Sequence, residues 1–84
     1  MRSVQFTFAP HVEAQHQAQR LEEISGWPEV VKVGQVDAAS PADAVRRMAY
    51  AYVRDDADPA AVAQRLRAVQ GIESASEPTP RGLA

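Results

Sequence analysis

In two short segments of the chain, purely apolar side chains alternate strictly with side chains that carry a polar group. Residues 4–8 read Val-Gln-Phe-Thr-Phe, and residues 49–53 read Ala-Tyr-Ala-Tyr-Val. Because successive side chains of a strand point to opposite faces of a sheet, this alternation is typical of a strand with one buried face. Two further segments, rich in Val, Ile and small side chains, are extended candidates. We therefore predict strands near residues 3–8, 29–36, 46–54 and 72–77.

The pattern A-Q-R-L-x-x-(I/V)-x-G occurs twice, at residues 18–26 and at residues 63–71, 45 positions apart. Each copy places apolar side chains three residues apart, as on one face of a helix, and ends in a Gly of the kind that follows helices. The pattern predicts two equivalent helices, near residues 11–25 and 59–70.

Local signals mark some of the helix starts. Asp58 followed by Pro59 is a strong start for the second helix, because the carboxylate accepts from free amides and Pro fits the first turn. The first helix has no comparable cap. In the connector between the two units, Ser40, Pro41 and Asp43 favour a single helical turn.

The order strand-helix-strand therefore occurs twice. With right-handed crossovers, such a doubled unit forms a four-stranded antiparallel sheet with both helices on one face. We predict an α+β ferredoxin-like βαββαβ sandwich, with a single domain over residues 1–77. Residues 78–84 contain two Pro and one Gly, and we expect them to form an extended C-terminal tail.

The strand alternation also assigns the faces. Val4, Phe6 and Phe8 should pack under the helices beside the small residues of the other central strand. The opposite, bare face should carry Gln5 and Thr7 together with Met48, Tyr50 and Tyr52. We expect the following side chains to be largely buried: Phe6, Phe8, Leu21, Ile24, Leu66 and Val69.

Met48, Tyr50 and Tyr52 form the strongest candidate site. Aromatic residues, Met and Arg are enriched at the centres of protein interfaces, and three arginines, Arg46, Arg47 and Arg54, flank this strip. We predict a partner-binding surface, for which a second copy of the chain counts as a partner. The alternative is that Tyr simply suits a strand and tolerates water at its hydroxyl.

Composition excludes several classes of function. The chain has 9 basic and 11 acidic residues and a net charge of -2, and most of its hydrophobic residues are Ala or Val. It lacks the basic excess of proteins that hold nucleic acid by its phosphates, and so small a core makes an enclosed cofactor pocket improbable. The absence of Cys excludes disulfides, thiol nucleophiles and thiolate metal sites.

Residues 50–53 also match the aromatic centre of the RNA-recognition motif, which shares the predicted fold. Outside that centre the match fails, because Met48 and Asp55 stand where the motif has a basic and an aromatic residue. We therefore predict no nucleic-acid binding.

Catalytic and metal-binding constellations are weak. His11 and His16 do not share a helix face, and the acidic run at residues 55–58 lacks the Gly and Glu of a calcium loop. We predict no enzyme activity, no catalytic residues, no metal and no cofactor. No segment resembles a signal peptide or a membrane span, so we expect a cytoplasmic protein without membrane contact.

Residues 58–84, with the motif itself at residues 61–77, resemble the C-terminal part of the peptidase-inhibitor family that includes the propeptides of subtilisin-like serine proteases. That part is a helix ending L-(x)-x-x-P-G-V, followed by a strand of the type V-x-x-V-E-x-D. Here Leu66 is followed by Gln70-Gly71-Ile72, with Gln70 in the place of the family's Pro. The resemblance implies a ferredoxin-like domain that binds and inhibits, or chaperones, a subtilisin-like protease.

In such complexes the bare sheet face packs on two parallel surface helices of the protease. The resemblance gives that role to Tyr50 and Tyr52, and gives Glu77 the role of the acidic residue that meets helix N-termini. The tail would lie in the substrate groove like a product, ending at Ala84. The segment concerned is Thr79, Pro80, Arg81, Gly82, Leu83 and Ala84.

A rival interpretation belongs to another class. Residues 27–31 and 70–72 are loosely similar to effector domains of leucine-responsive transcription regulators, which bind small ligands at subunit interfaces. On that interpretation the chain is a self-associating module, for example a homodimer, that binds a small ligand or regulates a partner protein.

Overall fold

The computed structural model describes residues 2–37 and 39–76, which form four strands and three helices. Along the chain they are β1 (Arg2–Phe8), α1 (Ala14–Ser25), β2 (Val30–Gln35), α2 (Asp43–Arg46), β3 (Met48–Val53), α3 (Pro59–Arg67) and β4 (Ile72–Ser76).

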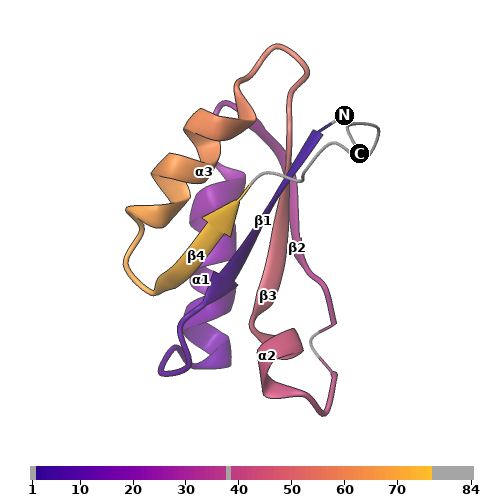
Figure 1. Ribbon diagram of the computed structural model, residues 1–84, viewed down its shortest axis with the longest axis vertical. Coiled ribbons are helices and arrows are strands. Elements are labelled where there is room, and N and C mark those ends of the chain that lie inside the picture. The colour runs from indigo at the N-terminus through magenta and orange to yellow at the C-terminus, as the bar shows by residue number, and fades with distance from the viewer. Residues whose placement is uncertain (1, 38, 77–84) are drawn as a thin grey trace, which may run out of the picture.

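The strands form one antiparallel sheet in the order β2-β3-β1-β4. Both long helices, α1 and α3, lie on the same side of this sheet, and the short α2 lies at the start of β3 (Figure 1). This arrangement confirms the predicted ferredoxin-like α+β sandwich. We call the uncovered side of the sheet the open face.

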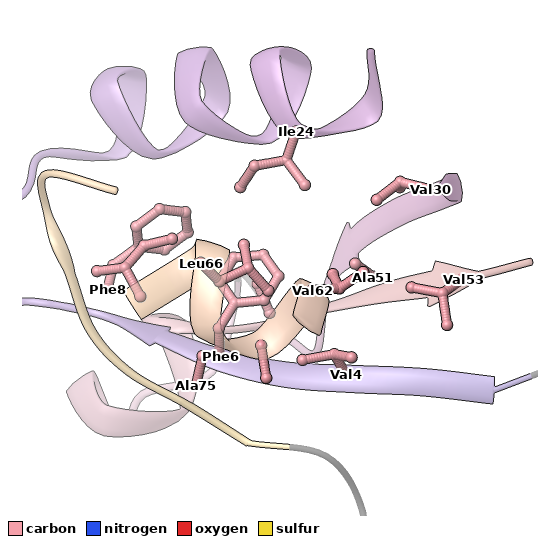
Figure 2. Packing of buried hydrophobic residues seen from close by; sticks show 13 residues of the cluster. Val4, Phe6, Phe8, Ile24, Val30, Ala51, Val53, Val62, Leu66 and Ala75 are labelled. Carbon is pink, nitrogen blue, oxygen red and sulfur yellow. The ribbon is translucent and has the colours of Figure 1, made fainter. Parts of the chain in front are cut away.

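Large side chains of β1 meet small side chains of β3 at the centre of the sheet. Val4 pairs with Ala51 and Phe6 with Ala49, and all four are buried under the helices. Figure 2 shows Ile24 pointing from α1 toward this layer, with Phe6, Phe8 and Leu66 around it. The alternation of sizes lets a thin layer fill without voids, as the sequence predicts.

Two of the six residues expected in the core are only half-buried. Leu66 has no exposed surface, whereas Leu21, its counterpart in the repeated pattern, is partly exposed, and so is Val69. The reasons differ for the two residues. Leu21 lies on α1, whose main contacts are with the edge strand β2, whereas α3 packs on two strands, β1 and β4. Val69 lies beyond the end of α3 at Arg67, in the turn that leads to β4.

The helix starts differ in their caps. Asp58 Oδ1 accepts from the Ala60 amide at 3.0 Å and Pro59 occupies the first turn, which confirms the predicted start of α3. At the first helix the prediction of a start near residue 11 is wrong: α1 begins at Ala14, after Glu13, whose side chain makes no capping bond. No side-chain cap stabilises a helix start near residue 11.

The predicted end of α3, near residue 70, is also wrong. The helix ends at Arg67 and not near residue 70, and Gly71 then adopts a φ of 94°, which turns the chain into β4. Only Gly adopts this left-handed conformation without strain.

The predicted third strand was too long at its N-terminal end. Arg46 and Arg47 belong to α2 and to its C-terminal cap, because Asp43 forms ion pairs with both, at 3.4 and 2.9 Å. The single helical turn predicted in the connector is thereby confirmed, with its start at Asp43.

Candidate functional site

Strand β3 places the predicted interface residues on the open face. Its side chains alternate between buried and half-buried, and the half-buried ones are Met48, Tyr50 and Tyr52, which we call the tyrosine strip. The buried ones face the helices. The predicted separation of the two faces is therefore confirmed, whereas the binding role of the strip remains a prediction.

The strand next to the tyrosine strip contributes only polar side chains to the open face. Tyr52 lies opposite Ser3, Tyr50 opposite Gln5, and Met48 opposite Thr7. On the other side of β3, Lys32 lies opposite Tyr52 and Gly34 lies opposite Tyr50. The open face thus carries one aromatic row between an uncharged row and an edge strand with a single Lys.

The two tyrosine rings pack against each other, and the Tyr50 ring lies over β2. Their centroids are 5.1 Å apart with the ring planes at 64°, an edge-to-face contact. A Cβ built on Gly34 would lie 2.5 Å from the Tyr50 hydroxyl oxygen and 2.8 Å from its Cζ. The Tyr50 ring therefore extends across the space that a side chain on Gly34 would need.

A hollow of about 170 Å³ lies beside Met48. Polar side chains from β1 and β4, Met48 of β3 and the exposed Val36 surround it. Its lining consists of Gln5, Phe6, Thr7, Val36, Met48, Ala49, Ser74 and Ser76. Together with the tyrosine strip, the hollow gives the open face both projecting rings and a depression, which are features that a protein partner can fit.

The arginines near the strip are engaged within the chain. Arg47, whose side chain is only 14% exposed, donates to the Phe8 carbonyl at 2.8 Å and pairs with Glu73 at 3.4 Å as well as with Asp43. Arg54 pairs with Asp56 at 3.1 Å. These contacts hold the arginine side chains to local carboxylates, so the strip itself presents an apolar and uncharged surface.

A second, polar pocket of about 220 Å³ lies at the opposite side of the sheet, between the start of α1 and α2. Gln17, only 6% exposed, accepts from Gln35 Nε2 at 2.9 Å and donates to the Val12 carbonyl at 3.1 Å. This pair is not among the residues predicted from the sequence. The available signal was the repeat itself, since Gln17 stands where the second unit has the buried Val62.

The remaining candidates have structural roles or no support. Trp27 is half-buried against the core, with the Arg65 guanidinium 4.0 Å from its ring centre. Within residues 2–37 and 39–76, no group of three or more His, Asp or Glu is placed to hold a metal ion. No helix in this part of the chain is long and apolar enough to cross a bilayer.

Part of the predicted site lies outside the described residues. This part comprises Glu77 and the tail residues Thr79, Pro80, Arg81, Gly82, Leu83 and Ala84. Comparisons with protein-family models, with curated proteins and with solved structures find no match for the chain.

Proposed function

We propose that the protein is a protein-binding domain that docks through its open face, and that its partner is a subtilisin-like serine protease. The observation that carries the proposal is the tyrosine strip: two tyrosines and a Met stand half-exposed on the side of the sheet that no helix covers. Such residues supply large apolar contact area at little cost in side-chain entropy.

The surroundings of the strip support docking of a macromolecule. The lining of the adjacent hollow includes the polar side chains Gln5, Thr7, Ser74 and Ser76, and the nearby arginines are paired with carboxylates. An apolar centre with a satisfied polar rim is the usual anatomy of a protein interface.

The class of partner rests on the resemblance of residues 61–77 to subtilisin propeptides. The fold and the bare sheet face agree with that resemblance. On this proposal, Tyr50 and Tyr52 pack on two surface helices of the protease, and Glu77 meets the helix N-termini, where a carboxylate is favourable.

The tail supplies the inhibition. Residues 79–84 enter the substrate groove as an extended strand and gain main-chain hydrogen bonds there. Pro78 and Pro80 stiffen the approach and reduce the entropy lost on binding. Docking and inhibition are thus assigned to different parts of the chain, and they can be separated.

The experiment is a titration of a panel of subtilisin-like proteases with the full chain and with a chain that lacks residues 79–84. The full chain should reduce protease activity at micromolar concentration and survive intact. The shortened chain should fail to inhibit but should still compete with the full chain for the protease. Digestion of the full chain, or activity unchanged across the panel, would exclude the inhibitor role.

A further inference from the structure

The two edges of the sheet differ in how their outward backbone groups are satisfied. Phe8 N donates to the Arg47 carbonyl, so by alternation the backbone groups of Phe6 also bond toward β3. Ala75 of β4 lies opposite Phe6, so its backbone amide and carbonyl point away from β1, toward the free edge. Arg67 Nε donates to this outward Ala75 carbonyl at 2.8 Å. A side chain from α3 thus covers the β4 edge.

The β2 edge has a different character. Val36 N donates to the Met48 carbonyl at 3.1 Å, so Gly34 also bonds toward β3, and the backbone groups of Val33 and Gln35 point outward. Among the described residues, the large hydrophobic side chains that are exposed are Val31 and Val36, at 53% and 51%, in and directly after this strand. An edge with outward amides and exposed valines is a template for another strand.

We infer that β2 pairs antiparallel with β2 of a second copy of this chain, around a two-fold axis at Val33. This pairing joins two four-stranded sheets into one sheet and leaves both open faces accessible. It goes beyond the proposed function and does not depend on it. A symmetric pair is the commonest arrangement of soluble homo-oligomers.

Charge and shape favour this register over one centred on Lys32. An axis at Lys32 would bring the two copies of Lys32 face to face, which is unfavourable for like charges. An axis at Val33 instead places Lys32 of one copy opposite Gly34 of the other, where there is no side chain to displace. It also pairs the outward backbone amide and carbonyl of Val33 with those of Val33 in the other copy. The pairing is argued over residues 32–35, because the register of β2 with β3 shifts between Val30 and Lys32.

The second copy contributes a side chain to the open face. The Tyr50 hydroxyl lies over Gly34, close to the sheet edge. In the inferred register, Lys32 of the second copy arrives at the same position, and its ammonium can donate to the Tyr50 hydroxyl or lie against the ring. The tyrosine strip is therefore extended across the dimer axis by a Lys from the other chain.

Acidic residues at the ends of the strand do not prevent this pairing. The same register brings Glu29 near Asp37 of the second copy. Each is already engaged within its own chain: Glu29 lies 3.6 Å from Arg65 Nη1, and Asp37 Oδ1 accepts from the Ala39 amide at 3.1 Å. Asp37 is exposed, so salt screens the remaining repulsion.

Cysteine crosslinking of the full chain tests the register, because the chain has no Cys of its own. Only the residue on the axis faces itself, so Val33→Cys should form a disulfide-linked dimer under mild oxidation, at a separation suited to a disulfide. Lys32→Cys should crosslink at least about tenfold more slowly. Faster crosslinking of Lys32→Cys than of Val33→Cys would overturn the inferred register.

Sedimentation of unmodified chains tests the pairing itself. The full chain should sediment as a dimer, and Val33→Pro, which removes an outward amide that the monomer does not use, should sediment as a folded monomer. Val33→Thr keeps the amide and the branched shape and should remain dimeric. A monomeric parent chain, or a Val33→Pro chain that is folded and still dimeric, would overturn the inference.

Discussion

The Tyr50 ring lies across Gly34 of the neighbouring strand, and its hydroxyl oxygen occupies the place where a side chain on Gly34 would begin. The two residues face each other in the β2–β3 register. This relationship holds the ring down on the open face and sets its edge-to-face contact with Tyr52. The shape of the candidate binding surface therefore depends on a residue that has no side chain.

Replacing Gly34 by Ala should reshape the tyrosine strip without unfolding the protein. The added methyl group displaces the flexible end of Tyr50, and loss of the ring contact costs about 0.5–1.5 kcal/mol. Reduced freedom of the unfolded chain offsets about 0.4–1 kcal/mol of this. The net change in unfolding free energy should stay within about 1 kcal/mol, while nuclear Overhauser contacts between the Tyr50 and Tyr52 rings should disappear.

Gly26→Ala is the matched control for this variant. A Cβ on Gly26 would meet only the Glu23 carbonyl oxygen, at 3.4 Å, which the structure can accommodate with a small shift. The ring contacts should persist in this control. Ring contacts that survive in Gly34→Ala would show that Tyr50 does not depend on the gap at Gly34.

Leu66 and Leu21 occupy equivalent positions of the repeated pattern but should differ in their contribution to stability. Leu66→Ala removes a side chain with no exposed surface and should cost about 2–5 kcal/mol. Leu21→Ala, at a half-buried position above the sheet edge, should cost clearly less. Urea unfolding of both variants measures the difference, and equal costs would contradict the unequal packing of α1 and α3.

The Gln17–Gln35 hydrogen bond should stabilise the contact between α1 and the end of β2. Gln17→Ala leaves the half-buried Gln35 amide with only its long, 3.5 Å bond to the Arg46 carbonyl and should cost about 1–3 kcal/mol. A double-mutant cycle with Gln35→Ala should give a coupling of about 0.5–1.5 kcal/mol.

The exposed Gln19 on the same helix is the control for that cycle. Gln19→Ala should change the unfolding free energy by less than about 0.5 kcal/mol. Zero coupling between the Gln17 and Gln35 substitutions would mean that the bond does not contribute to stability in solution.

The fold could be predicted because separate signals in the sequence agreed. The alternation at Phe6 and Phe8 fixed the buried face of one central strand, and the repeat carried the same assignment to Ala49 and Ala51. Asp58 and Pro59 marked a helix start by local chemistry alone. Such signals depend on a few neighbouring residues, so tertiary context does not change them.

Other features depend on contacts that the sequence does not encode locally. The partial exposure of Leu21 follows from which strand α1 covers, and the role of Gly34 follows from the β2–β3 register. The bond between Gln17 and Gln35 joins residues 18 positions apart through the packing of a helix on an edge strand. Only the assembled sheet brings these residues together.

Affinity for a catalytically inactivated subtilisin-like protease tests the docking role of the open face most directly. An inactive protease cannot digest the chain, so binding is measured without cleavage. The variant Tyr50→Thr with Tyr52→Thr keeps strand propensity while it removes both rings. Its control, Gln15→Ala with Gln19→Ala, changes two exposed side chains on α1, on the helical side of the sheet.

We expect the parent chain and the α1 control to bind a member of the protease panel with equal affinity, and the double tyrosine variant to bind at least about tenfold more weakly while remaining folded. Equal affinity of the tyrosine variant and the parent chain, or no binding of the parent chain to any member of the panel, would contradict the proposal.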